Sequence, residues 1–209
     1  MNSIKYLKYL ILTRSNPLHT FYLSKPKVLD VGCGEGEFLA KMPKCRIGVD
    51  IDARLVRKCV ERGFVAHHMS ALKLDFQDNT FDAVHAAELI EHFNPEMAVA
   101  FLAEASRVLK PGCVLYLTTP GERSVWNTFS HVKPYPPIAI RKLLDKTTEG
   151  FVHESDLPLI LESSFSFSNS FRSLILTGLK RAFDIAFPPR FPSGYVIILR
   201  KQHAISCNN

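Results

Sequence analysis

Three glycines alternate with other residues directly after a short apolar run. The run Val28-Leu29-Asp30-Val31 carries one acid, and Gly32, Gly34 and Gly36 follow it. Glycine permits the backbone angles of a tight turn and lets a ligand approach the main chain closely. A helix that begins after such a turn offers free N–H groups and its positive dipole end to a carboxylate. The pattern therefore predicts a ligand-binding turn between a strand and a helix.

The spacing and charge of this turn select among ligands. A dinucleotide-binding loop needs GxGxxG, whereas this turn reads GxGxG and is followed by Glu37. A pyrophosphate would meet Asp30 and Glu35 unfavourably, but a ligand with ammonium and sulfonium charges would not. This disfavours an NAD-dependent oxidoreductase. The alternative is a glycine turn that only packs a helix against a strand.

A second acid at the end of a predicted strand suits a ribose. Asp50 lies 20 residues after Asp30 and can accept hydrogen bonds from both ribose hydroxyls. Oxidoreductases share this feature, so it discriminates poorly alone. The alternative is that Asp50 or Asp52 caps the helix predicted from Ala53, and Asp52 is the better candidate for that cap.

Candidate proton-transfer groups follow the fourth predicted strand. Glu88, Glu91 and His92 stand at the edge of the sheet where ligands bind, and His131 lies in a proline-rich segment further on. An oxygen nucleophile needs a base, most often histidine or a carboxylate. Alternatively, His92 holds the loop backbone and His131 packs a turn.

Apolar runs and amphipathic stretches alternate along the chain, which predicts a parallel, doubly wound α/β sheet. The predicted strands are 28–31, 46–50, 64–67, 81–86, 113–119, 165–171 and 195–201, and the predicted helices are 4–23, one from 37, 53–62, 97–109 and 153–163.

Five segments, in this order, resemble the class I S-adenosylmethionine (SAM)-dependent methyltransferase superfamily, and most closely its type 11/type 23 domains. They are VLDVGCGEGEF, GVDID, LDFQDNTFD, ELIEH and SRVLKPGCVLYLTTPG, within residues 26–121. The resemblance implies a Rossmann-like sheet of seven strands, mostly parallel with an antiparallel last strand. It implies SAM as cofactor and S-adenosylhomocysteine as product. We expect a helical lead-in over 1–25 and a methyltransferase domain over 26–209, with substrate-side segments and an insert over 122–192.

The resemblance also implies which residues contact the cofactor. These are Asp30, Gly32, Cys33, Gly34 and Gly36 at the methionine end, Asp50 at the ribose, Ile51, Ser70 and Ala71 around the adenine, and Glu88 where the cofactor and substrate pockets meet. Many relatives carry Asp where this chain has Ser70.

The five cysteines are scattered, and none forms a CxxC pair. This disfavours a disulfide framework and a zinc site, so we expect no metal. Reduced thiols fit a cytoplasmic protein. No signal peptide and no membrane-spanning run is expected.

Basic charge gathers at the two ends of a chain whose net charge is +6. Residues 1–27 and 172–209 each carry +5, which leaves −4 in the middle. Residues 172–192 mix basic and large apolar side chains. This segment is either a helix packed on the domain or an interfacial helix that makes peripheral contact with an anionic membrane.

Taken together, these features predict methyl transfer from SAM to an oxygen or nitrogen of a small molecule, with saccharides and lipid-linked precursors among the acceptors considered. Ala87-Glu88-Leu89-Ile90 stands where an amino-directed DNA methyltransferase would carry an Asn/Asp-Pro-Pro-Tyr/Phe run, which disfavours nucleic acid as a partner. The alternatives are an RNA or protein methyltransferase and a non-catalytic SAM-fold partner subunit.

Overall fold

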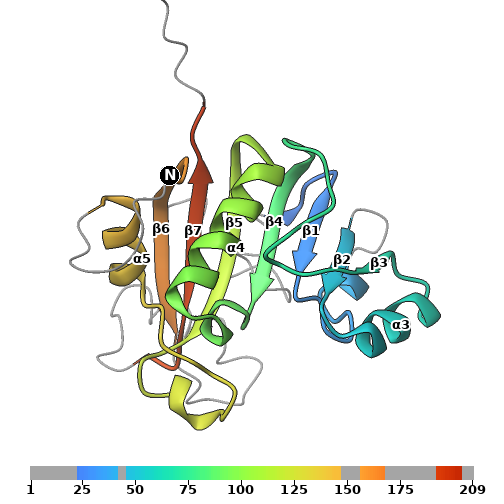
Figure 1. The fold of residues 1–209 in the computed structure, drawn as a ribbon, viewed down its shortest axis with the longest axis horizontal. Helices are drawn as coiled ribbons and strands as arrows, with labels where there is room; N and C mark the ends of the chain where they lie inside the picture. The colour runs from blue at the N-terminus through green and yellow to red at the C-terminus, as the bar shows by residue number, and fades with distance from the viewer. Residues whose placement is uncertain (1–22, 42–45, 147–155, 168–191, 204–209) are drawn as a thin grey trace, which may run out of the picture.

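The computed structural model describes residues 23–41, 46–146, 156–167 and 192–203. Its centre is a seven-stranded sheet of order β3-β2-β1-β4-β5-β7-β6 (Figure 1). The strands are β1 (Val28–Val31), β2 (Arg46–Asp50), β3 (Ala66–His68), β4 (Phe81–Ala87), β5 (Leu109–Pro120), β6 (Leu159–Phe167) and β7 (Gly194–Lys201). β1 to β5 pair in parallel, and β7 is antiparallel to both β5 and β6. The predicted sheet with an antiparallel last strand is confirmed.

In the part of the chain that the structure describes, three helices and three short 3₁₀ turns connect the strands. They are α3 (Ala53–Glu61), α4 (Pro95–Val108), α5 (Pro137–Leu144), η1 (Leu39–Lys41), η3 (Ile90–His92) and η4 (Val125–Asn127). The Asp52 carboxylate accepts a hydrogen bond from the backbone N–H of Arg54, so its predicted role as the cap of α3 is confirmed. α4 begins in the same way, with Asn94 accepting from the N–H of Met97 and Pro95 at its first turn.

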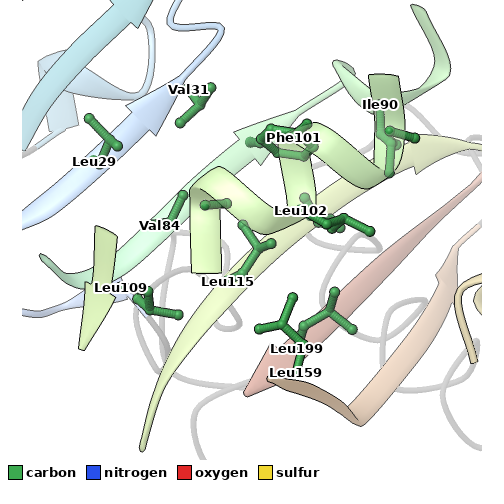
Figure 2. Close-up of a cluster of buried hydrophobic side chains, with 14 of the residues drawn as sticks. Leu29, Val31, Val84, Ile90, Phe101, Leu102, Leu109, Leu115, Leu159 and Leu199 are labelled. Atoms are coloured by element: carbon green, nitrogen blue, oxygen red, sulfur yellow. The ribbon is translucent and has the colours of Figure 1, made fainter. Parts of the chain in front are cut away.

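Helix α4 packs across the sheet and closes the largest apolar cluster (Figure 2). Phe101 and Leu102 of α4 are fully buried over Val84 and Leu115 of the two central strands. A second cluster is formed by the alternate residues of the sheet, among them Ala83 of β4, Tyr116 of β5 and Ile198 of β7, and by Phe38 from the segment after the glycine turn. Burial on both faces explains why β4 is largely apolar and why β5 contains the apolar run Val114–Leu117.

The segment after residue 121 departs from the sequence prediction. The helix predicted over 153–163 is wrong at Leu159–Ser163, because these residues belong to β6 and pair with β7. Their side chains alternate between more and less buried positions, which is the period of a strand. Helix α5 follows the proline-rich segment and was not predicted. Its Pro137 occupies the first turn, where a missing N–H costs nothing.

Several predictions concern parts of the chain outside the described residues. The lead-in over 1–25 is described only from Leu23, and the insert over 172–191 is not described. The helix predicted from residue 37 appears as the turn η1, and residues 42–45 beyond it are not described. Among the described residues, no helix combines the length and apolar character needed to cross a membrane.

Candidate functional site

A cavity of about 490 Å³ lies against the glycine turn, near the carboxyl ends of β1 and β4. This volume is in the range of small-molecule pockets. Its lining residues are Asp30, Gly32, Cys33, Gly34, Glu35, Glu37, Phe38, Lys41, His85, Ala87 and Thr118. Four of the predicted cofactor residues are therefore on its wall, namely Asp30, Gly32, Cys33 and Gly34. A cavity of about 590 Å³ between α5 and β6 lies away from this turn.

The three glycines of the turn have different surroundings. All have positive φ angles, of 74°, 53° and 83° for Gly32, Gly34 and Gly36. A Cβ added to Gly34 would meet no atom within 4 Å, so this position is open toward the cavity. A Cβ on Gly36 would stand 2.9 Å from the Phe64 ring. Gly34 thus leaves room for a ligand, whereas Gly36 allows the turn to pack on the chain that follows α3.

The Asp30 carboxylate is buried and paired inside the cavity wall. His85 of β4 lies opposite Asp30 in the sheet, and its Nδ1 is 2.6 Å from Asp30 Oδ1. Both residues are 2% exposed. The ring of Phe38 stacks on His85 with its centroid 3.8 Å away. This contact fixes the imidazole and orients the carboxylate, which can still accept further hydrogen bonds.

Asp50 holds the glycine turn from the neighbouring strand. Its Oδ2 accepts from the Gly34 N–H and its Oδ1 from the Asp52 N–H, each at 2.9 Å. Ile51, beside it, is 70% exposed, as expected of a residue that a planar ligand would cover. The predicted adenine-edge residues Ser70 and Ala71 follow β3 and are not on the wall of the 490 Å³ cavity. The Ser70 hydroxyl accepts from the N–H of Leu72.

Glu88 adopts a backbone conformation that few non-glycine residues take. Its φ angle is 52°, and its carboxylate accepts a hydrogen bond from the Thr118 hydroxyl at 3.0 Å. Since Thr118 lines the cavity, Glu88 stands beside the cavity mouth. Strained backbone of this kind often marks a functional site.

Glu91, His92 and His131 form a compact cluster at the same edge of the sheet. One donor atom of each lies within 4.8 Å of the others. Glu91 is fully buried, and burial raises the pKa of its carboxyl to about 7, with the nearby Glu88 charge acting in the same direction. The backbone N–H of Val132 donates to the carbonyl of Glu91 at 2.8 Å, which ties the proline-rich segment to η3. Three of the four predicted proton-transfer candidates, Glu91, His92 and His131, are thus brought together.

Comparison with known proteins shows what this arrangement is similar to. A family profile described as a methyltransferase domain matches residues 28–112, the part that contains the glycine turn, Asp30 and Asp50. Residues 28–112 therefore match a methyltransferase domain, and the described sheet has the fold of SAM-dependent methyltransferases. This fold implies SAM as the cofactor, as the sequence resemblance did.

The solved structures and curated proteins that resemble this chain include several methyltransferases. A SAM-dependent methyltransferase from Archaeoglobus fulgidus superposes with a TM-score of 0.63 at 21% identity, over 95% of this chain and 90% of its own. The human mitochondrial ubiquinone biosynthesis O-methyltransferase is 30% identical over 66% of this chain and 40% of its own length. An Arabidopsis thaliana tRNA (carboxymethyluridine(34)-5-O)-methyltransferase is 31% identical over 44% of this chain and 23% of its own. The chain spans less than half the length of these two curated relatives.

The residues of the methyltransferase cavity fit SAM. Three carboxylates, those of Asp30, Glu35 and Glu37, line the cavity beside the open space at Gly34. They favour the ammonium and sulfonium charges of SAM and oppose a pyrophosphate. Glu35 is partly neutralised by Lys58, whose Nζ is 2.7 Å from Glu35 Oε1. Lys41 also lines the cavity, so the wall keeps the carboxylates of Asp30 and Glu37 against one ammonium group and remains acidic.

Sequence reasoning missed His85, Phe38 and Thr118 as cavity residues of the methyltransferase domain. The first had a signal, because His85 interrupts an otherwise apolar strand and so marks a buried polar contact. The other two had none, since a phenylalanine after the turn and a threonine in an apolar strand read as ordinary core positions.

Proposed function

We propose that this protein transfers a methyl group from SAM to an oxygen or nitrogen atom of a small molecule. The observation that carries the proposal is the open, acid-lined cavity at Gly34, next to polar side chains at the carboxyl edge of the sheet. Retention of this cavity disfavours the non-catalytic alternative, because a partner subunit does not need room for a ligand there.

Bound SAM supplies the methyl group on a sulfonium, which is already a good leaving group. In this proposal Asp30 accepts a hydrogen bond from its ammonium group, and Asp50 accepts from its ribose. Gly34 lets the chain of the ligand lie against the turn. The protein's main tasks are then to align the acceptor in line with the methyl group and to exclude water.

A hydroxyl acceptor would also need a route for its proton. His131 Nδ1 is 2.8 Å from the carbonyl oxygen of Val125, so Nδ1 carries the proton and Nε2 is the basic nitrogen. His92 is oriented in the same sense by the carbonyl of Ser130 at 3.2 Å. Either Nε2 is a candidate base, whereas Glu88 is engaged with Thr118. These roles remain predictions.

The acceptor class divides the proposal into two testable versions. The human relative named for ubiquinone biosynthesis supports a small-molecule acceptor, and saccharides and lipid-linked precursors remain within this class. The plant relative named for tRNA, together with the basic ends of the chain, supports an RNA acceptor. Acceptor binding that weakens steeply with salt would identify RNA, since each neutralised phosphate adds to the slope.

Cofactor binding is the first test. We expect calorimetry to give micromolar dissociation constants for SAM and S-adenosylhomocysteine, about −8 kcal/mol of binding free energy. Release of S-adenosylhomocysteine with an acceptor panel would then establish transfer. NADH binding in the absence of binding by either ligand would reject the proposal.

Replacing Asp50 should weaken the cofactor complex. In Asp50→Ala the ribose loses a charged acceptor and the Gly34 N–H loses its partner. We expect a loss of about 2 kcal/mol, roughly a thirtyfold rise in the dissociation constant for SAM. Asp52→Ala is the matched control, because it removes the cap of α3 but not the contact to the turn. Equal SAM affinity in Asp50→Ala and in the parent would place the ribose elsewhere.

We also propose a cytoplasmic protein with peripheral membrane contact through residues 172–192. The free thiols of Cys33, Cys59 and Cys113 support the first part, and the basic and apolar composition of the segment supports the second. The segment should bind anionic vesicles in a salt-sensitive way, and Lys180→Glu/Arg181→Glu should remove the binding. Equal, negligible co-sedimentation with anionic and neutral vesicles would contradict membrane contact.

A further inference from the structure

The geometry points to a divalent metal site formed by Glu91, His92 and His131. Two imidazoles and one carboxylate converge from η3 and from the segment after η4, with one donor atom of each within 4.8 Å of the others. Ligand atoms bound to one tetrahedral ion at about 2.1 Å stand about 3.4 Å apart. Side-chain rotations that move each donor by about 1 Å close the site.

The Glu91 carboxylate lacks the partners that a buried charge requires. Its side chain is fully buried, and among the described residues neither of its oxygens has a hydrogen-bond donor. The hydroxyl of Thr119 lies nearby without reaching hydrogen-bond geometry. His131 Nε2 lies 3.9 Å from Glu91 Oε1, which is too far for a hydrogen bond. Buried carboxylates are normally paired or bound to a metal ion, and a cation between these groups supplies the missing partner.

Both histidines are held in the form that a metal ion needs. The Nδ1 of His131 donates to the carbonyl of Val125, and the Nδ1 of His92 donates to the carbonyl of Ser130. A backbone carbonyl can only accept, so each Nδ1 carries the proton and each Nε2 keeps a free lone pair. Metal-binding histidines almost always have such an outer hydrogen bond, which fixes the tautomer and ring orientation. The two rings lie edge to face with their centroids 4.7 Å apart, which suits nitrogens that converge on one point.

The ligand set also indicates the class of ion. Two imidazoles with one carboxylate suit zinc and similar transition metals, whereas magnesium and calcium prefer oxygen ligands. Three protein ligands leave coordination positions open for water. Binding of an acceptor oxygen at such a position rests on the proposed function. The prediction of no metal from the sequence considered cysteine patterns, and it did not anticipate that η3 and residue 131 meet. In this site the two histidines are ligands in place of candidate bases.

Zinc binding to the full, tag-free chain tests the site without any methyl transfer. After treatment with a chelator and dialysis, calorimetric titration with zinc sulfate should show one saturable site per chain. Zinc should also raise the midpoint of thermal unfolding, since an ion that binds only the folded state stabilises it. Glu91→Gln and His92→Ala should each weaken zinc binding by about 100-fold or more and remove the thermal shift. Unfolding midpoints without zinc show whether each variant is folded.

His203→Ala is the matched control. His203 is exposed after β7 and lies close to Gly112, near the start of β5, whereas the cluster follows the carboxyl end of β4. It should bind zinc as the parent does. Absence of saturable zinc binding in the parent, or parental affinity in either Glu91→Gln or His92→Ala, would overturn the site. A separate titration with SAM distinguishes the two proposals: lost zinc binding with retained SAM binding leaves the proposed function standing, and the reverse result rejects only the function.

Discussion

Gly34→Val should abolish useful SAM binding while leaving a folded protein. Gly34 has a φ angle of 53°, and the space around its missing Cβ opens into the cavity. A valine side chain would occupy ligand space next to the Asp30 carboxylate. We expect the dissociation constant for SAM to rise by about 100-fold or more, which corresponds to about 2.7 kcal/mol. Calorimetry with SAM, combined with thermal unfolding, measures the two effects separately.

Gly63→Val separates backbone strain from loss of ligand space. Gly63 follows α3 with a φ angle of 80°, and a Cβ there also meets no atom within 4 Å. Both variants therefore carry the strain of a branched residue in the left-handed region, about 1–2 kcal/mol. Of the two glycines, Gly34 lines the cavity and Gly63 does not. If the two variants bind SAM equally well, the cavity at Gly34 is not the cofactor site.

The parts of the fold that sequence reasoning recovered are those with strong local signals. β1, β2 and β4 are largely buried strands with apolar centres, and the glycines after β1 require positive φ angles that other residues resist. The cap of α3 follows from Asp52 with the same clarity, whereas the Asn94 cap of α4 was not predicted. In each of the predicted places the neighbouring residues alone were sufficient to indicate the local structure.

The parts that were missed depend on contacts between distant residues. The first part of edge strand β6, Leu159–Ser163, was taken for a helix, whereas Phe165–Phe167 lies in a predicted strand. The strand mixes serine with apolar side chains, so only its pairing with β7 decides the outcome. The cluster of Glu91 and His131 joins residues 40 positions apart, through the hydrogen bond from the Val132 N–H to the Glu91 carbonyl. The contact of Asp30 with His85 likewise exists only because β1 and β4 are neighbours. Local propensity carries no information about such pairs.

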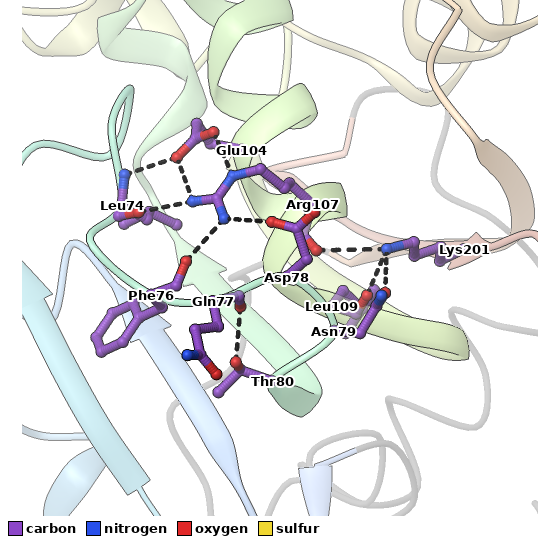
Figure 3. Close-up of polar contacts among 10 residues, drawn as sticks. All are labelled: Leu74, Phe76, Gln77, Asp78, Asn79, Thr80, Glu104, Arg107, Leu109 and Lys201. Atoms are coloured by element: carbon purple, nitrogen blue, oxygen red, sulfur yellow. Dashed lines mark hydrogen bonds and ion pairs between the residues drawn. The ribbon is translucent and has the colours of Figure 1, made fainter.

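One further contact of this kind supports the loop between β3 and β4 (Figure 3). Arg107 of α4 donates to both carboxylate oxygens of Glu104, to the Asp78 carboxylate, and to two backbone carbonyls of the loop, those of Leu74 and Phe76. Glu104 in turn accepts from the Leu74 N–H at 2.7 Å. A planar guanidinium satisfies this arrangement of acceptors, and no other side chain offers the same fork of donors.

Arg107→Met should therefore destabilise the fold more than a surface change does. The substitution keeps much of the side-chain volume but removes the donor to the Leu74 and Phe76 carbonyls and leaves the Glu104 carboxylate with the Leu74 N–H alone. The Arg107 side chain is 32% exposed and that of Glu104 21%, so water recovers part of the loss. We expect about 3 kcal/mol lower free energy of unfolding, or a midpoint lower by about 6–12 °C for a domain of this size. Arg57→Met, at an exposed position on α3, is the matched control. Chemical denaturation of both variants measures the difference, and a gap of less than about 0.5 kcal/mol would show that the network adds nothing beyond an ordinary surface arginine.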